Sequence, residues 1–184
     1  IDRIFLVEGE IKTDLPSLSM IEDYEPIDYY HNDYNESAVS SRVVQNSVEN
    51  SRMGVDSEVF KHNLDKVVDN AIISLCGEIE QNDSVMVIGT EEFMFYPLMI
   101  ARDMQMSLGC EVKYRATTRS PICACFDDEY IIKDSITLPS AYDENRQTYL
   151  YNMNGDYNKI VVVSDVNMTN KFKQALSKFA KENH

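Results

Sequence analysis

The sequence predicts an α/β fold, in which a mostly parallel sheet is flanked by helices. Two observations lead to this prediction. Val85–Ile88 and Ile160–Val163 are continuous apolar runs of strand length, as expected for parallel strands that are buried on both faces. Segments with helical periodicity lie between and after such runs. This alternation is typical of parallel strands connected by helices.

The elements are expected in a fixed order along the chain. The run Ile4–Val7 is a candidate first strand. Asp56 and Ser57 are good N-caps for a helix whose apolar face runs from Phe60 to Ile79. The later elements are expected at these places: a strand at Val85–Ile88, a helix at about 93–107 with Pro97 in its first turn or at a kink, a strand at Glu111–Ala116, a hairpin of Pro121–Cys125 and Tyr130–Leu138, strands at Tyr149–Met153 and Lys159–Val163, and a helix at 168–182.

The composition restricts the function classes. With 184 residues, 43% of them apolar, the chain is long enough for one domain with a real core. The net charge of -14 argues against nucleic acid and anionic lipid as partners, because their phosphates require a basic face. No apolar run of about 18 residues and no signal peptide is present, so we expect a cytoplasmic protein with no membrane partner.

The cysteines and histidines do not form a recognisable site. Cys76, Cys110, Cys123 and Cys125 contain no C-x-x-C pair, and no histidine lies near them in sequence. Reduced, mostly buried thiols are therefore expected rather than a structural zinc site. We predict no metal ligands from this pattern.

A domain boundary is expected near Ser51. Residues 1–50 contain the candidate first strand and an acidic, tyrosine-rich stretch at 21–37 that has no lysine or arginine. This stretch is either a solvated loop or a docking segment for a partner domain, because tyrosines provide rigid contact area. Residues 51–184 are expected to form the α/β domain.

Polar clusters follow two neighbouring strands of the predicted sheet. Gly89, Thr90, Glu91 and Glu92 come directly after the first strand, and the second cluster consists of Thr117, Thr118, Arg119 and Ser120. The carboxyl ends of parallel strands meet at one edge of a sheet, where open α/β sheets bind ligands. The sequence therefore predicts a ligand site at this edge.

The residue types suggest two kinds of chemistry. Arg119 can pair bidentately with a phosphate or carboxylate, assisted by the neighbouring hydroxyls, or it can simply pair with a nearby acid in a surface turn. Glu91 and Glu92 can act as general base or hold a divalent cation such as magnesium. They can equally be favourable charges at a helix N-terminus, or the ion-pair partners of Arg119. The residue types alone do not identify a cofactor.

A third strand end belongs to the same edge. Residues 160–166 resemble a degenerate phosphoribosyltransferase signature. In the full signature, an apolar strand precedes two adjacent acids and a Thr-Gly-rich loop. Only Asp165 remains of the acid pair, Ser164 takes the other place, and the glycine is missing. The expected fold is therefore Rossmann-like and resembles a degenerate phosphoribosyltransferase fold with a β-hairpin hood. Asp165 joins Glu91 and Glu92 as a candidate for a catalytic role.

Four further groupings of residues belong together: Gly89–Met94, Thr117–Ile122, Tyr149–Asn152 and Arg52-Met53-Gly54. Together these segments resemble the TRSP domain family, and the last of them is similar to the Arg-x-Gly that opens the domain. The resemblance implies that the two polar clusters form the family site. It adds five further ligand-binding candidates: Arg52, Tyr142, Asp143, Arg146 and Asn152.

The family resemblance also implies a cellular role. Such domains lie C-terminal to a phosphoribosyltransferase domain, in bacterial gene clusters linked to tellurite resistance and stress. We therefore expect a ligand-binding or catalytic partner of a phosphoribosyltransferase domain, which handles a small phosphorylated or ribosyl metabolite. Two alternatives are an independent transferase or hydrolase acting on such a metabolite, and a non-catalytic interaction module.

Overall fold

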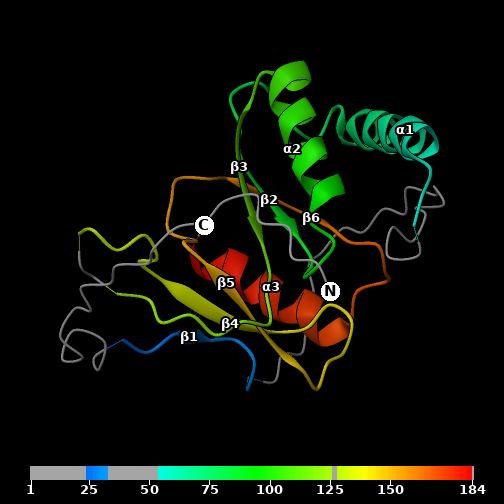
Figure 1. Ribbon diagram of the computed structural model, residues 1–184. Helices are drawn as coiled ribbons and strands as arrows, with labels where there is room; N and C mark the ends of the chain where they lie inside the picture. Colours follow the sequence, from blue (N-terminus) through cyan, green and yellow to red (C-terminus); the bar gives the residue numbers. More distant parts are fainter. Residues whose placement is uncertain (1–23, 33–53, 126–127, 184) are drawn as a thin grey trace.

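The computed structural model describes residues 24–32, 54–125 and 128–183. In these residues the protein is mixed α/β, with three helices and two three-stranded sheets (Figure 1). The helices are α1 (Ser57–Leu75), α2 (Phe95–Leu108) and α3 (Asn170–Asn183). The strands are β1 (Ile27–Asp28), β2 (Ser84–Gly89), β3 (Glu111–Ala116), β4 (Ser135–Pro139), β5 (Gln147–Tyr151) and β6 (Lys159–Val163).

The first sheet has the order β3-β2-β6 and is entirely parallel, which confirms the prediction from the apolar runs. Its central strand β2 is buried from Val85 to Gly89. Gly89 pairs with Ala116 of β3 and with Val163 of β6. The three strands therefore end together, and the polar residues that follow them share one edge.

Helices cover both faces of this sheet. On one face, Val85 and Val87 pack in a buried cluster with residues of α1 and α2, among them Val68 and Ile100. Asp56 caps α1 as predicted, because its carboxylate accepts hydrogen bonds from the backbone N–H groups of residues 58 and 59. Helix α2 begins at Phe95 and has Pro97 buried in its first turn, where a missing N–H costs nothing.

The second sheet has the order β1-β4-β5, so the described residues form two small sheets rather than the single sheet that we expected. Strands β4 and β5 form an antiparallel hairpin, joined by the loop 140–146. The two sheets meet where Thr118, just beyond β3, exchanges backbone hydrogen bonds of 2.9 and 2.8 Å with Tyr149 of β5. The segment after β3 is thereby held beside the hairpin.

The predicted hairpin of Pro121–Cys125 and Tyr130–Leu138 is wrong. Residues 121–125 have no regular secondary structure, and β4 begins only at Ser135. The correct partner of β4 is β5, because this pairing places the apolar side chains of Ile136, Leu138 and Leu150 together in a buried core. In 121–125 only the last two residues are buried, so this segment has little to contribute to a core.

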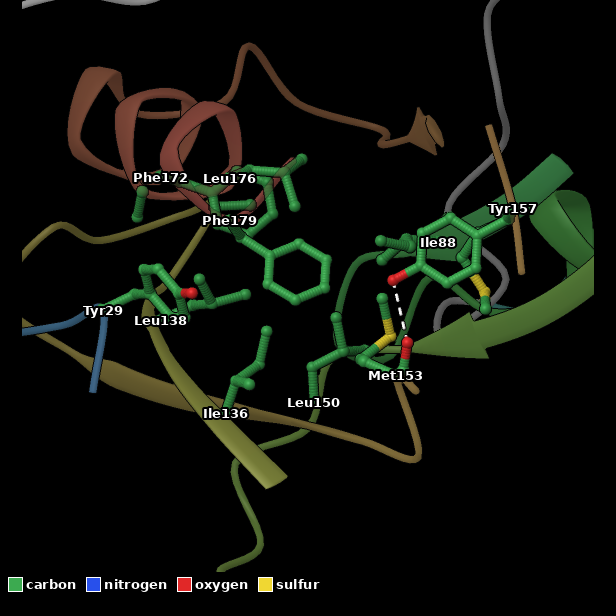
Figure 2. Close-up of a cluster of buried hydrophobic side chains, with 13 residues drawn as sticks. Tyr29, Ile88, Ile136, Leu138, Leu150, Met153, Tyr157, Phe172, Leu176 and Phe179 are labelled. Atoms are coloured by element: carbon green, nitrogen blue, oxygen red, sulfur yellow. Dashed lines mark hydrogen bonds between the residues drawn. The ribbon is translucent and has the colours of Figure 1, made fainter. Parts of the chain in front are cut away.

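The core between the hairpin and α3 is shown in Figure 2. Phe172 and Phe179 of α3 pack in one buried cluster with Ile136, Leu138 and Leu150. Met86 and Ile88 belong to the same cluster and reach it from the other face of β2. Helix α3 therefore lies between the two sheets and fixes their relative position.

Of the N-terminal 53 residues, the structure describes 24–32. The candidate strand Ile4–Val7 and the segment around Arg52 lie outside the described residues. Within the acidic stretch, Ile27–Asp28 forms the edge strand β1, which pairs in parallel with β4. None of the helices in the described ranges is long and apolar enough to cross a membrane.

Candidate functional site

The first polar cluster forms a strained turn at the end of β2. The N–H of Phe93 donates a 2.9 Å hydrogen bond to the carbonyl of Thr90, which closes a four-residue turn. Glu91 has a φ of 50°, whereas Glu92 does not have a positive φ. This pattern is that of a type II′ turn, whose first central position usually holds glycine. A non-glycine residue in this conformation costs free energy and is common at functional sites.

Gly89 makes the turn possible. A Cβ atom on residue 89 would lie 2.9 Å from the carbonyl oxygen of Phe93 and 3.0 Å from the hydroxyl of Tyr114. The first of these atoms belongs to the backbone and cannot easily move aside. Glycine is therefore needed here for the close approach of the backbone at residues 89 and 93.

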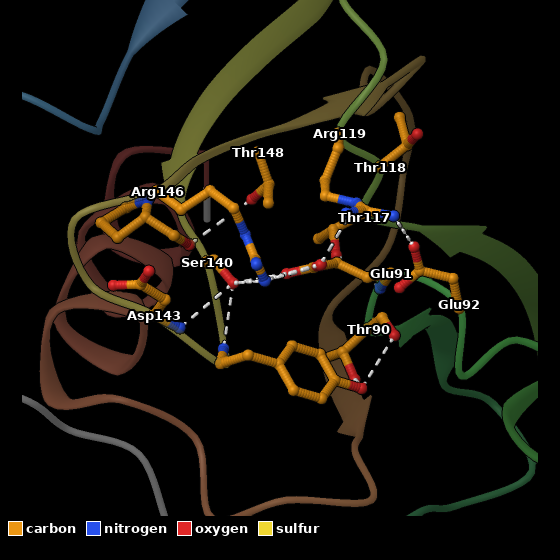
Figure 3. A network of polar contacts seen from close by, with 12 residues as sticks. Thr90, Glu91, Glu92, Thr117, Thr118, Arg119, Ser140, Asp143, Arg146 and Thr148 are labelled. Carbon is orange, nitrogen blue, oxygen red and sulfur yellow. Dashed lines mark hydrogen bonds and ion pairs between the residues drawn. The ribbon is translucent and has the colours of Figure 1, made fainter.

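Glu91 is buried and lies at the centre of a polar network (Figure 3). Its carboxylate oxygens lie 2.9 and 2.8 Å from Nη2 of Arg146, and one of them accepts a hydrogen bond from the hydroxyl of Ser140. Nε of Arg119 is 3.8 Å from the carboxylate. The backbone N–H of Glu91 donates to the hydroxyl of Thr117 at 2.9 Å, so the two predicted clusters are in direct contact.

Ser140 was missed in the sequence analysis. It is fully buried, and its hydroxyl oxygen accepts hydrogen bonds from Nη2 of Arg146 at 3.0 Å and from the backbone N–H groups of Tyr142 at 3.0 Å and Asp143 at 3.3 Å. Its own N–H donates to the carbonyl of Arg146 at 2.7 Å. Ser140 directly follows β4, as Thr90 follows β2 and Thr117 follows β3, and this position is the signal that could have identified it.

Arg119 pairs with Glu92, as one of the sequence-based alternatives foresaw. Both side chains are exposed, by 57% for Arg119 and 46% for Glu92. Ion pairs with this exposure contribute only about 0–1 kcal/mol. The Arg119 guanidinium can therefore exchange Glu92 for another anion at low cost, whereas Glu91 is locked in place.

Asp165 lies at the third strand end and joins the same network. Its carboxylate accepts a 2.5 Å hydrogen bond from the hydroxyl of Tyr142. The hydroxyl of Thr90 lies 3.1 Å from the Tyr142 hydroxyl and 3.1 Å from that of Ser164. The ends of β2 and β6 and the hairpin loop thus meet at Tyr142, as the parallel topology predicted for Asp165.

The tyrosine pKa values lead to a prediction about alkaline stability. Burial, followed by the hydrogen bond to Asp165, raises the pKa of Tyr142 from 10.0 to about 12, and burial does the same for Tyr114 and Tyr157. A raised pKa means that the folded state holds the phenol proton more tightly than the unfolded state does. The resulting contribution to the free energy of unfolding is fully present below pH 10 and is lost as the pH rises towards 12. Each such group contributes a slope of up to about 1.4 kcal/mol per pH unit.

We therefore expect the free energy of unfolding, measured by urea titration, to fall steeply between pH 10 and 12. The substitution Tyr142→Phe should make this dependence on pH shallower by the contribution of one tyrosine, which is up to about 1.4 kcal/mol per pH unit. Tyr114→Phe and Tyr157→Phe should reduce the slope by similar amounts, because burial raises the pKa of both tyrosines as well. An equal slope in Tyr142→Phe and the parent protein would contradict the prediction.

The remaining candidates serve mainly to shape the site or lie away from it. Thr118 accepts a 3.2 Å hydrogen bond from the N–H of Ser120, and Asp143 accepts one of 3.0 Å from the N–H of Asn145, so both brace their own loops. Asn152 follows the opposite end of β5 from Arg146, and its side chain accepts a 2.8 Å hydrogen bond from the N–H of Lys133. Arg52 lies outside the described residues.

A metal centre finds no support in this arrangement. In the ranges that the structure describes, no group of three or more histidine, cysteine, aspartate or glutamate side chains is placed to hold a metal ion. The carboxylate of Glu91 is occupied by Arg146 and Ser140. Glu92 and Asp165 are the exposed carboxylates at this edge, and each has a partner within the protein.

The fold and site define a class of protein: an α/β domain with a polar site at the carboxyl edge of a parallel sheet, centred on a buried glutamate–arginine pair. The sequence model of the family described as "TRSP domain C terminus to PRTase_2" matches residues 49–179. The chain therefore belongs to the TRSP domain family, which confirms the resemblance found in its motifs. No curated protein and no solved structure matches the chain.

Proposed function

We propose that the edge formed by the ends of β2, β3 and β6 binds a small phosphorylated ribosyl metabolite. The observation that carries this proposal is the exposure of the Arg119 guanidinium. It lies beside Glu91, which is buried and already paired with Arg146. A phosphate can replace the exposed Glu92 as the partner of Arg119, with bidentate geometry. The turn at residues 90–93 holds Glu91 3.8 Å from Nε of Arg119 and would keep the guanidinium in place.

A second donor supports the same proposal. Nε of Arg146 is buried, and no acceptor for it is found in the described part of the chain. A buried N–H without a partner is rare in proteins and is often satisfied by water or by a ligand. An acceptor group of a ligand bound beside Arg119 and Arg146 would satisfy it.

The wider role follows from the family. We propose that the domain works beside a phosphoribosyltransferase domain and binds, or acts on, the nucleotide- or nucleoside-like metabolite that this partner makes. The proposal includes a cytoplasmic location and a role in the bacterial tellurite-type stress response. It also includes a distant relationship of this fold to phosphoribosyltransferases, in which the β4–β5 hairpin corresponds to the hood.

Calorimetric titration with ribose 5-phosphate tests the ligand proposal. The substitution Arg119→Ala is expected to weaken binding at least tenfold, since charge-assisted hydrogen bonds are worth about 1.5–3 kcal/mol. Arg102 is a matched control, because it is also 57% exposed and pairs with an acid, Asp103, on helix α2. Equal affinity of Arg119→Ala and Arg102→Ala for ribose 5-phosphate would refute the assignment.

A further inference from the structure

Strand β1 comes from a part of the chain that precedes the family domain. The family match begins at residue 49, yet Ile27–Asp28 pairs with β4 and lies along the edge of the second sheet (Figure 1). We infer that β4, the C-terminal half of α3 and the loop 140–146 form a strand-binding surface that recognises an extended, acidic, tyrosine-bearing segment. Its occupant is the segment 24–32 of this chain, and this occupant positions the loop that carries Arg146.

The edge of β4 supplies the backbone part of the recognition. The N–H of Tyr29 donates a 2.9 Å hydrogen bond to the carbonyl of Thr137, and the N–H of Ser135 donates one of 2.5 Å to the hydroxyl of Tyr24. The hydroxyl of Thr137 donates to the carboxylate of Asp28 at 2.8 Å. An edge strand with this pattern of donors and acceptors is the usual template for an added strand.

Helix α3 supplies the side-chain part. The ring of Tyr29 is 4% exposed and packs edge-to-face on Phe179, with ring centroids 5.8 Å apart. Its hydroxyl donates a 2.7 Å hydrogen bond to Glu182. The C-terminal half of α3 carries Lys178 and Lys181 against Glu182, in a chain whose net charge is -14. This local basic character favours an acidic occupant over a neutral or basic one.

The segment also reaches the candidate site. The hydroxyl of Tyr30 donates a 2.8 Å hydrogen bond to the carbonyl of Asn145, the residue next to Arg146. The loop is closed by the hydrogen bond from Ser140 N–H to the Arg146 carbonyl, and the Arg146 guanidinium contacts Glu91. Tyr30 is therefore a positioning residue, which acts on Glu91 through Arg146.

Hydrogen exchange of the full chain tests this inference without any ligand at the site. Tyr29→Pro removes both the N–H and the buried ring, and we expect amide exchange of residues 140–146 to become at least tenfold faster. Tyr30→Phe removes only the contact with Asn145 and should accelerate exchange of the same loop severalfold, while the amides of β2 stay protected. Tyr130→Phe, on an exposed tyrosine outside this surface, should change neither.

A peptide in trans tests the recognition itself. A synthetic peptide of residues 22–34, added in excess to the Tyr29→Pro protein, should restore slow exchange in the loop, whereas the same peptide carrying Tyr29→Pro should not. Loop exchange that is unchanged in Tyr30→Phe would overturn the link between segment and site. Equal effects of the two peptides would overturn the strand-binding surface. Neither outcome depends on whether ribose 5-phosphate binds.

Discussion

Arg146→Ala is expected to lower the free energy of unfolding by about 2–3 kcal/mol, measured by urea titration at pH 7. The substitution leaves the carboxylate of Glu91, which is 3% exposed, without the guanidinium that contacts both its oxygens. Removing one partner of a fully buried ion pair costs about 3–5 kcal/mol. The expected loss is smaller here, because the Arg146 side chain is 38% exposed and Ser140 remains bonded to Glu91.

A double-mutant cycle separates this pair from general effects of substitution. Glu91→Gln and Arg146→Met, alone and combined, should give a coupling energy of about 1–3 kcal/mol, as expected for residues within one ion-pair network. The exposed pair of Arg102 and Asp103 should give less than about 1 kcal/mol in the same experiment. Coupling energies of equal size in the two pairs would contradict the central place given to Glu91.

Phe172→Ala is expected to destabilise the protein still more, by about 3–5 kcal/mol. Phe172 is 0% exposed and packs in the cluster that joins both sheets to α3 (Figure 2). Removing its ring opens a cavity between elements that can close only if α3 moves. The free energy of unfolding again gives the measurement.

The milder substitution Phe172→Leu keeps most of the volume and should cost clearly less than Phe172→Ala. Phe172 lies in the apolar core rather than in the Glu91 network, so the fraction that remains folded should bind ribose 5-phosphate as tightly as the parent protein does. Arg119→Ala should have the opposite effects, with weak binding and near-parent stability. If Phe172→Ala were as stable as the parent, the core between the sheets would be wrongly placed.

The sequence was informative wherever structure is decided locally. Strands β3 and β6 have the predicted bounds, because their apolar content and flanking turns are local signals. The meeting of Glu91, Thr117 and Asp165 at one edge followed from topology, since parallel strands bring their ends together. The contact of Arg119 with Glu92 was one of two alternatives that the residue types allowed.

Structure that depends on distant partners could not be predicted in this way. Strand β1 has only two residues in an acidic stretch, and it is strand only because β4 offers an edge. The pairing of β4 with β5 is set by the shared burial of Ile136 and Leu150. Ser140 is one of several polar residues in its loop, and composition does not reveal which hydroxyl turns inward to Glu91. Arg146 entered only through the family resemblance.

Amide chemical shifts of the isotope-labelled full chain, titrated with ribose 5-phosphate, test the proposed ligand site most directly. We predict that the largest shift changes fall on the ends of the three parallel strands, at residues 90–92, 117–120 and 164–166, and that Arg119→Ala abolishes them. Arg102→Ala should reproduce the parent titration. Shift changes that are absent from these three segments, or that persist in Arg119→Ala, would contradict the assignment of a phosphate-binding site to this edge of the sheet.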